Sequence, residues 1–262
     1  MRLASALADL VLPSGCAGCD AERVPLRSGV CERCVTRLDA LSPFPAVPVP
    51  PPAGMPACVA AGAYGGALRG VLLAYKEKGR HRLARPLGAL LAGAVTHIAP
   101  DRSRPLLLIP VPSTARAARE RHGDHMARLT AHTVRHLRAA GWQAEVIQPL
   151  RASARPDSAS LDAAGRAGVA ESSLRIRAGR IRVLQREPTM RRTLVVVDDI
   201  VTTGATLAAV VSRLREANVQ VTGAAVIAAT ERRRAVPGHL AALSRRGSVP
   251  GVRHQFGSPI EG

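Results

Sequence analysis

The sequence has few aromatic residues, which make up 2% of its 262 residues, and few lysines, since Lys76 and Lys78 are the only two. Arginine therefore carries nearly all of the positive charge. Without many aromatic rings, a core must be built from Val, Leu, Ile and Ala, and a platform of stacked aromatics for nucleobases is disfavoured. Because 47% of the residues are apolar, the composition still predicts a packed protein rather than a disordered chain.

Long hydrophobic runs are also missing. The first apolar stretch, MRLASALADLVLP (residues 1–13), is interrupted by Asp9 and is too short to span a membrane. It has one basic residue and no clean small-residue cleavage site, which argues against a signal peptide. No other segment reaches membrane length, so we expect a cytoplasmic protein without a membrane span.

The charge is strongly unbalanced, with 37 Lys and Arg against 19 Asp and Glu and a net charge of +18. Such a balance favours polyanionic partners, namely nucleic acids, phosphorylated metabolites or an acidic membrane surface. A genome rich in G and C, which enriches Arg and Ala, explains the same charge equally well. The end of the chain, residues 231–262, is basic and contains Gly and Pro, and we expect it to be disordered.

Four of the five cysteines form two C-x-x-C pairs, Cys16 with Cys19 and Cys31 with Cys34. Two intervening residues allow a tight turn to direct both sulfurs at one point, and two such turns complete a tetrahedron around zinc. The pattern predicts a structural zinc site, and a redox-active dithiol pair is the alternative. Cys58 is unpaired in this pattern and is typical of a small core residue.

The composition divides the chain into four parts. We expect an N-terminal helix and a four-cysteine zinc module in residues 1–41 and a proline-rich linker in 42–56. The main domain then covers 57–230, and the basic tail covers 231–262. Within the main domain, a polar and basic stretch at 151–192 is poorly periodic and predicts a long arm with some helix.

Apolar strands and amphipathic helices alternate along the main domain, which predicts an α/β fold with a mainly parallel sheet flanked by helices. The expected strands are 57–63, 106–111, 144–149, 193–199 and 219–229. The expected helices are 67–77, 81–98 and 206–217, and residues 117–140 are expected to form one long helix or a pair of helices.

The stretch VVVDDIVTTGAT, Val195 to Thr206, places Asp198 and Asp199 at the end of a buried strand, followed by a Thr/Gly loop and a helix. Ligands bind beyond the carboxyl ends of parallel strands, and a helix start suits a phosphate. Two acids beside a phosphate fit vicinal sugar hydroxyls or a bound Mg²⁺, so the ligand implied is a phosphorylated ribose. A Walker B strand is excluded, since the chain has no P-loop. In another interpretation Asp198 simply caps the following turn, but this accounts for one of the two acids and not for the Thr/Gly loop.

This stretch resembles the phosphoribosyl-pyrophosphate (PRPP) motif of type I phosphoribosyltransferases. The resemblance implies that Asp198 and Asp199 contact the ribose hydroxyls, with Mg²⁺ bound together with PRPP. It also implies that the following loop holds the 5-phosphate. The loop residues are Thr202, Thr203, Gly204, Ala205 and Thr206.

More of the chain resembles the ComF family, competence-associated phosphoribosyltransferase-like proteins with an N-terminal cysteine zinc module. The similar segments are LVLPSGCAGCD with CERC, ALRGVLLAYKEKGRHRLARPLGALL, IPVPSTARAARERHGDHMARL and RPDSASLDAAGRAGV, and together they span about residues 10–230. One departure lies at Arg121-His122-Gly123-Asp124, where the glycine is one position later than in the family pattern. The resemblance implies a role in DNA uptake, with single-stranded DNA and a competence helicase as partners.

In type I phosphoribosyltransferases, a nucleophile displaces pyrophosphate from the sugar, and basic groups stabilise the leaving charge. Arg116, Arg119 and Arg121 follow the Ile109-to-Pro112 strand end, and Lys76 stands at the family's basic position. These four residues are the candidates for pyrophosphate or phosphate contacts. A solvated arginine-rich helix face and a plain surface lysine are the alternatives.

Three functions compete at this point. The first is a ComF-like protein that binds PRPP and Mg²⁺ and acts in DNA uptake or single-stranded DNA processing. The second is an active phosphoribosyltransferase, hence a glycosyltransferase, with an unidentified nucleobase-like acceptor. The third is a non-catalytic, zinc-bearing interaction protein. We interpret the chain as the first.

Overall fold

The computed structural model describes residues 15–99, 101–114, 118–119, 123–153, 174–186 and 191–230. The predicted N-terminal helix within residues 1–14 and the predicted disorder of 231–262 lie outside these residues, as does much of the predicted arm. Within the described part of the chain, none of the helices has the length and apolar character needed to cross a membrane.

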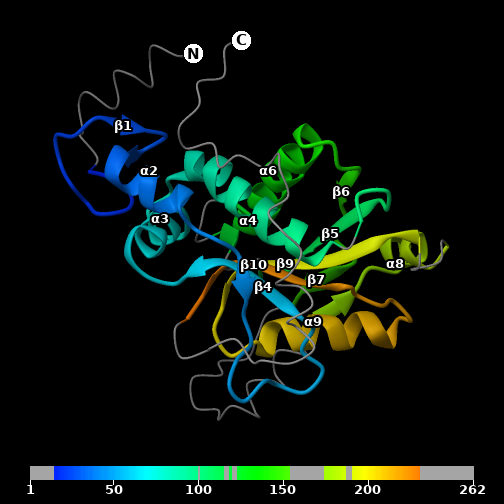
Figure 1. Ribbon diagram of the computed structural model, residues 1–262. Helices are drawn as coiled ribbons and strands as arrows, with labels where there is room; N and C mark the ends of the chain where they lie inside the picture. The colour runs from blue at the N-terminus through cyan, green and yellow to red at the C-terminus, as the bar shows by residue number, and fades with distance from the viewer. Residues whose placement is uncertain are drawn as a thin grey trace.

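The centre of the molecule is a six-stranded sheet in the order β3-β4-β10-β9-β5-β6 (Figure 1). All neighbouring strands pair in parallel except β3, which pairs antiparallel with β4 at one edge. This sheet confirms the predicted α/β class. The strands are β3 (Phe44–Pro45), β4 (Cys58–Ala63), β5 (Leu106–Pro110), β6 (Ala144–Val146), β9 (Thr193–Val201) and β10 (Gly223–Ala229).

Helices cover both faces of the sheet (Figure 1). On one face α4 packs against β4 and β10 and also against α6, which contacts β5. On the other face α9 contacts β9. The helical segments are α3 (Gly66–Lys76), η1 (His81–Leu83), α4 (Ala84–Ile98), α6 (His125–Ala139), α8 (Ala178–Gln185) and α9 (Ala205–Glu216).

Most element bounds lie within a few residues of those expected. Strand β6 ends at Val146 instead of residue 149, and β10 begins at Gly223 instead of residue 219. Strand β9 extends two residues beyond its expected end, so that both aspartates, which the expected strand also included, lie just before the last residues of the strand. The helix or pair of helices expected at 117–140 is described at residues 118–119, which are helical, and at α6. Helix α6 begins at His125, where Asp124 caps the N-terminus by accepting a hydrogen bond from the Ala127 amide. The helix expected from residue 81 begins as one turn of 3₁₀-helix, η1.

Strand β9 is buried on both faces of the sheet, and its side chains alternate between two hydrophobic clusters. Val195 and Val197 belong to the cluster with α3, α4 and α6, whereas Leu194 and Val196 belong to the cluster with α9. Because side chains of a strand point to opposite faces in turn, the adjacent Asp198 and Asp199 face opposite sides of the sheet.

The cysteine segment consists of a small hairpin, β1 (Leu26–Arg27) with β2 (Val30–Cys31), followed by α2 (Glu32–Asp39). Helix α2 packs against α3, and Leu38 shares a hydrophobic cluster with that helix. The proline-rich stretch contributes β3 to the sheet edge, and the Ala46 amide donates to the Cys58 carbonyl oxygen over 2.8 Å. The predicted division of the chain into four parts stays a prediction.

The described ends of the predicted arm form a second hairpin. Strand β7 (Leu150–Ala152) pairs antiparallel with β8 (Leu174–Ile176), and α8 follows directly. The Arg213 side chain of α9 donates to the Leu174 carbonyl oxygen, which ties this hairpin to the sheet's outer helix. The residues between β7 and β8, from 154 to 173, lie outside the described part.

Candidate functional site

Asp199 is the most tightly held residue at the carboxyl end of β9. Its Oδ2 lies 2.9 Å from Lys76 Nζ and 2.9 Å from His125 Nε2, and the residue is 5% exposed. Burial opposes ionisation, but the hydrogen bond from His125 and the charge of Lys76 hold the pKa of Asp199 below its ordinary value. The structure thus contains an ionised buried carboxylate with two partners from distant parts of the chain.

Asp198 has a different environment on the other face of the sheet. Its side chain is half-buried, and its Oδ1 accepts a hydrogen bond from the Asp199 amide over 2.9 Å. Burial, followed by the neighbouring charge of Asp199, raises the pKa of Asp198 to about 8. The two acids predicted to act as a pair therefore differ in protonation near neutral pH.

His125 is placed by several contacts that the sequence did not reveal. It is the first residue of α6, its backbone carbonyl accepts the Tyr75 hydroxyl over 2.6 Å, and its Nδ1 lies 3.5 Å from Ser113 Oγ. Ser113 follows β5, the strand beside β9. Asp is a favoured residue type at a helix N-cap, so Asp124 is a local signal that could have located the start of α6 at His125.

The predicted phosphate loop joins β9 to α9 as expected. Gly204 is buried, has φ of +73°, and immediately precedes the helix, so only glycine adopts this backbone without cost. Thr202 and Thr203 are exposed, and Thr203 Oγ1 accepts a hydrogen bond from the Ala205 amide over 3.3 Å. Amides in the first turn of a helix have no partner within the helix and can bind an anion.

The proline-rich segment lies against this loop. A Cβ built on Gly204 would lie 2.4 Å from Met55 Sδ and 2.9 Å from Pro48 Cγ. Thus the stretch expected to be a spacer forms one wall beside the phosphate loop.

The four basic candidates have different positions. Lys76 joins the site through Asp199, whereas Arg119 is exposed in the segment between β5 and α6. Arg116 and Arg121 lie outside the described residues. Arg128, one turn into α6, was not predicted, and its guanidinium lies 3.0 Å from His81 Nδ1.

The four predicted metal ligands converge. The sulfurs of Cys16, Cys19, Cys31 and Cys34 all lie within 4.8 Å of one another, and those of Cys19 and Cys31 are 3.8 Å apart. A tetrahedron with Zn–S bonds of about 2.3 Å has edges of about 3.8 Å, so the cluster has the size of a zinc site.

Local hydrogen bonds prepare these sulfurs for metal binding. The amides of Gly18 and Cys31 donate to Cys16 Sγ over 3.3 and 3.2 Å. A backbone hydrogen bond from Ala21 lowers the pKa of Cys19 to about 6, while burial raises that of Cys34. Amides that donate to sulfur stabilise thiolates, the form that binds zinc. The residues therefore fit zinc, which would fix the cysteine segment when bound.

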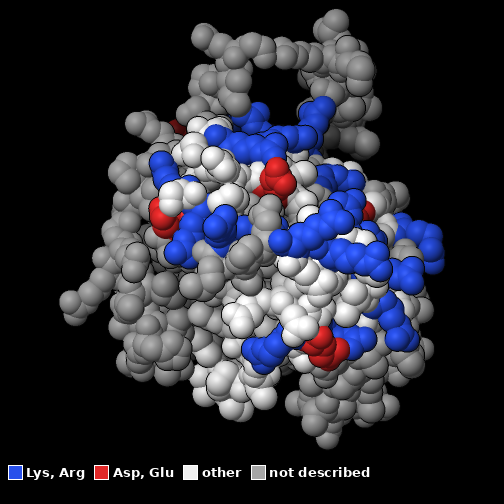
Figure 2. Space-filling model, turned by 90° about the vertical axis from the view of Figure 1, so that its right-hand side faces the viewer, with Lys and Arg blue, Asp and Glu red and all other residues white. Residues whose placement is uncertain are grey.

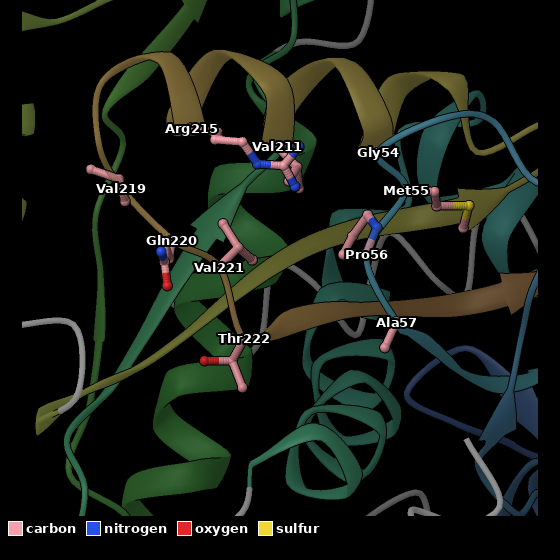
Figure 3. A pocket seen from close by; sticks show the side chains of 10 residues that line it. All are labelled: Gly54, Met55, Pro56, Ala57, Val211, Arg215, Val219, Gln220, Val221 and Thr222. Atoms are coloured by element: carbon pink, nitrogen blue, oxygen red, sulfur yellow. The ribbon is translucent and has the colours of Figure 1, made fainter. Parts of the chain in front are cut away.

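A separate cavity of about 390 Å³ lies under the C-terminal part of α9 (Figure 3). It is bounded by the segment from Gly54 to Ala57, by Val211 and Arg215 of α9, and by the loop from Val219 to Thr222. Since this loop leads into β10, the cavity lies toward the amino ends of the parallel strands. It is therefore distinct from the site formed by the aspartates at the carboxyl ends.

One side of the molecule carries a concentration of basic side chains (Figure 2). The segment from Leu174 to Arg186, which forms β8 and α8, contains no acidic residue. Its arginines and that of β7 are exposed: Arg151, Arg175, Arg177, Arg180, Arg182 and Arg186. We call these six residues the α8 basic surface.

Comparison with known families supports the interpretation of β9 and α9. The family model for the phosphoribosyl transferase domain matches residues 167–243, a range that includes β9, the phosphate loop, α9 and β10. No curated protein matches the chain. The chain therefore combines a mainly parallel sheet, a segment similar to the phosphoribosyl transferase domain, and a cluster of four cysteines that could hold zinc.

Proposed function

We propose that the protein binds PRPP together with Mg²⁺ at the carboxyl ends of β5 and β9. The observation that carries this proposal is the arrangement of two aspartates at the end of β9, a buried Gly204 with positive φ and the free start of α9. The match of this segment to the phosphoribosyl transferase domain supports it.

In this proposal, different residues contact different groups of PRPP. Residues 202–206 hold the 5-phosphate at the α9 start, where backbone amides and the helix dipole favour an anion. Asp198 and Asp199 bind the ribose hydroxyls, and Mg²⁺ neutralises the pyrophosphate. Arg116, Arg119 and Arg121, which follow β5 in the sequence, are the proposed contacts to pyrophosphate, while Lys76 acts through its contact with Asp199.

Calorimetric titration with PRPP, with and without Mg²⁺, tests the proposal. We expect binding that depends on Mg²⁺ and that the double variant Asp198→Asn/Asp199→Asn loses. Glu145→Gln is the matched control, since it makes the same chemical change at an exposed acid on β6. A folded wild-type protein that binds no PRPP would contradict the proposal.

The cellular role that fits best is that of a cytoplasmic ComF-like protein in DNA uptake, binding single-stranded DNA and cooperating with a competence helicase. The α8 basic surface supports a polyanionic partner, since six exposed arginines lie there. With few aromatic residues, contacts to phosphates would dominate and the affinity would fall steeply with salt.

Titration of labelled single-stranded DNA at several salt concentrations tests this role. The affinity of the triple variant Arg177→Gln/Arg180→Gln/Arg182→Gln should depend less steeply on salt. The negative slope of log affinity against log salt should become smaller in magnitude by about 0.7 for each phosphate that the protein no longer neutralises. Exposed Arg23, Arg27 and Arg37 in the cysteine segment provide the matched control triple. Weak binding without salt dependence in the wild type would contradict a DNA-binding role.

The phosphoribosyl transferase domain also favours a second function, transfer of ribose 5-phosphate to an acceptor. Release of pyrophosphate from PRPP with one member of a nucleobase panel would establish it. PRPP binding without turnover across the panel would instead indicate a sensor. A non-catalytic, zinc-bearing interaction protein predicts that Asp198→Ala leaves the cellular phenotype unchanged.

A further inference from the structure

We infer that Lys76 and His125 are positioning residues that together hold one oxygen of Asp199, so that the other oxygen faces the bound ribose. This inference rests on the proposed function, because it assigns roles within the same PRPP site. It differs from the expectation that Lys76 contacts a phosphate of the ligand.

The two carboxylate oxygens of Asp199 have different surroundings. Lys76 Nζ and His125 Nε2 both lie 2.9 Å from Oδ2. Oδ1 has no hydrogen-bond partner among the described residues, and the side chain keeps 8% of its surface exposed. A carboxylate held through one oxygen keeps acceptor capacity on the other, which suits a hydroxyl donor.

His125 is fixed so that it can donate to this carboxylate. Because the ionised Asp199 only accepts hydrogen bonds, His125 Nε2 must carry the hydrogen. Its Nδ1 lies 3.5 Å from Ser113 Oγ, and its carbonyl accepts the buried Tyr75 hydroxyl over 2.6 Å. The ring therefore has a contact on each nitrogen, and its backbone is tied to α3.

Lys76 is constrained in a similar way. It is the last residue of α3, where a positive charge interacts favourably with the helix dipole. Its side chain is 19% exposed and reaches an almost buried carboxylate. Moving Lys76 onto the pyrophosphate would leave that carboxylate with His125 as its remaining described partner, which is unfavourable for a buried charge.

The contacts join α3, α6 and β9, three elements far apart in sequence. An ionised carboxylate that is already oriented needs no rearrangement when the ribose binds. Loss of either partner should therefore weaken recognition of the sugar, even when the phosphate loop is intact.

A double-mutant cycle with two ligands tests the role of Lys76. We expect Lys76→Met to weaken binding of both PRPP and ribose 5-phosphate, in the presence of Mg²⁺, by about tenfold. In an Asp199→Asn background the same change should have almost no further effect, because residues that act through one another are not additive. Lys78→Met is the matched control, since the Lys78 side chain is 62% exposed and pairs with the exposed Asp20.

The opposite pattern would overturn the inference. If Lys76→Met weakens PRPP but leaves ribose 5-phosphate unchanged, and does so equally in Asp199→Asn, Lys76 is a direct pyrophosphate ligand. If the wild type binds PRPP and Lys76→Met changes neither affinity, Lys76 has no role in the site. If the well-folded wild type binds neither ligand, the proposed function fails and this inference falls with it.

A comparison of a conservative and a non-conservative substitution tests the role of His125 separately. His125→Gln keeps an N–H donor at similar reach and should retain most of the ribose 5-phosphate affinity, whereas His125→Leu should lower that affinity about tenfold. Thermal unfolding of both variants, in the absence of ligand, checks that each is folded. Equal affinities for the Gln and Leu variants, with both folded, would show that donation to Asp199 plays no part in binding.

Discussion

The backbone of Gly18, between the first two cysteines, lies in direct contact with Gly70 of α3. A Cβ on Gly70 would lie 2.5 Å from the Gly18 carbonyl oxygen and 2.8 Å from that of Ala17. Arg80 adds two hydrogen bonds across this contact, to the carbonyl oxygens of Gly15 and Gly29 over 2.8 and 3.1 Å. The cysteine segment is therefore packed onto the helix that ends at Lys76.

We predict that Gly70→Ala lowers the free energy of unfolding by about 1–3 kcal/mol or more, because the atoms in the way belong to backbone. Urea unfolding measures this change. Gly179→Ala in α8 is the control, since a Cβ there would meet nothing within 4 Å, and its effect should stay within about 1 kcal/mol. Equal stability of the two variants would mean that the backbone around Gly70 relaxes freely.

Removal of zinc should affect more than the cysteine segment. Cys16, Cys31 and Cys34 belong to the same hydrophobic cluster as Leu72 of α3, so we expect chelation to unfold the segment and to weaken PRPP binding several-fold. Metal analysis together with PRPP titration, before and after chelation, checks this. Unchanged PRPP affinity in a zinc-free protein would show that the two parts are independent, as the predicted domain division implies.

Gly204→Ala should weaken PRPP binding at least tenfold for two reasons. A residue with a Cβ pays about 1–2 kcal/mol in the left-handed region, and the Cβ would collide with Met55. The double variant Gly204→Ala/Met55→Ala should recover only part of the affinity, since it removes the collision but not the backbone cost. Full recovery by the double variant would assign the whole effect to packing.

PRPP binding near pH 7 should release a proton from Asp198. Burial and the charge of Asp199 raise its pKa from 3.8 to about 8 in the folded protein, whereas Mg²⁺ and hydroxyl donors favour the carboxylate. The affinity for PRPP and Mg²⁺ should therefore rise as the pH increases toward 8. Titration in two buffers with different ionisation enthalpies measures the released proton, which Asp198→Asn should abolish.

The same shift has a defined effect on stability. Between pH 3.8 and about 8 the folded state holds a proton on Asp198 that the unfolded chain has lost, so this residue makes the protein less stable as the pH rises through that window. Asp199 acts in the opposite sense, because its lowered pKa adds stability that is lost in acid. Asp198→Asn should flatten the stability profile between pH 3.8 and about 8, and an unchanged profile would argue against the raised pKa.

Local patterns were enough to predict the chemistry-bearing segments. The spacing of Cys16, Cys19, Cys31 and Cys34 anticipated a cluster that the structure brings together, because a C-x-x-C turn is a short-range feature. Likewise, the Asp-Asp-x-x-Thr-Thr-Gly stretch anticipated a strand, a loop and a helix, since each element follows from residues within a few positions.

What the sequence by itself determined is the class of fold, the loop between β9 and α9 with its glycine, and the cysteine cluster. Only the tertiary structure decided that Asp198 and Asp199 face opposite sides of the sheet, that Lys76 and His125 share one oxygen of Asp199, and that the proline-rich segment lies against Gly204. These contacts join residues tens of positions apart, and no local pattern encodes them. They arise because burying the apolar faces of the sheet and helices fixes which distant side chains meet.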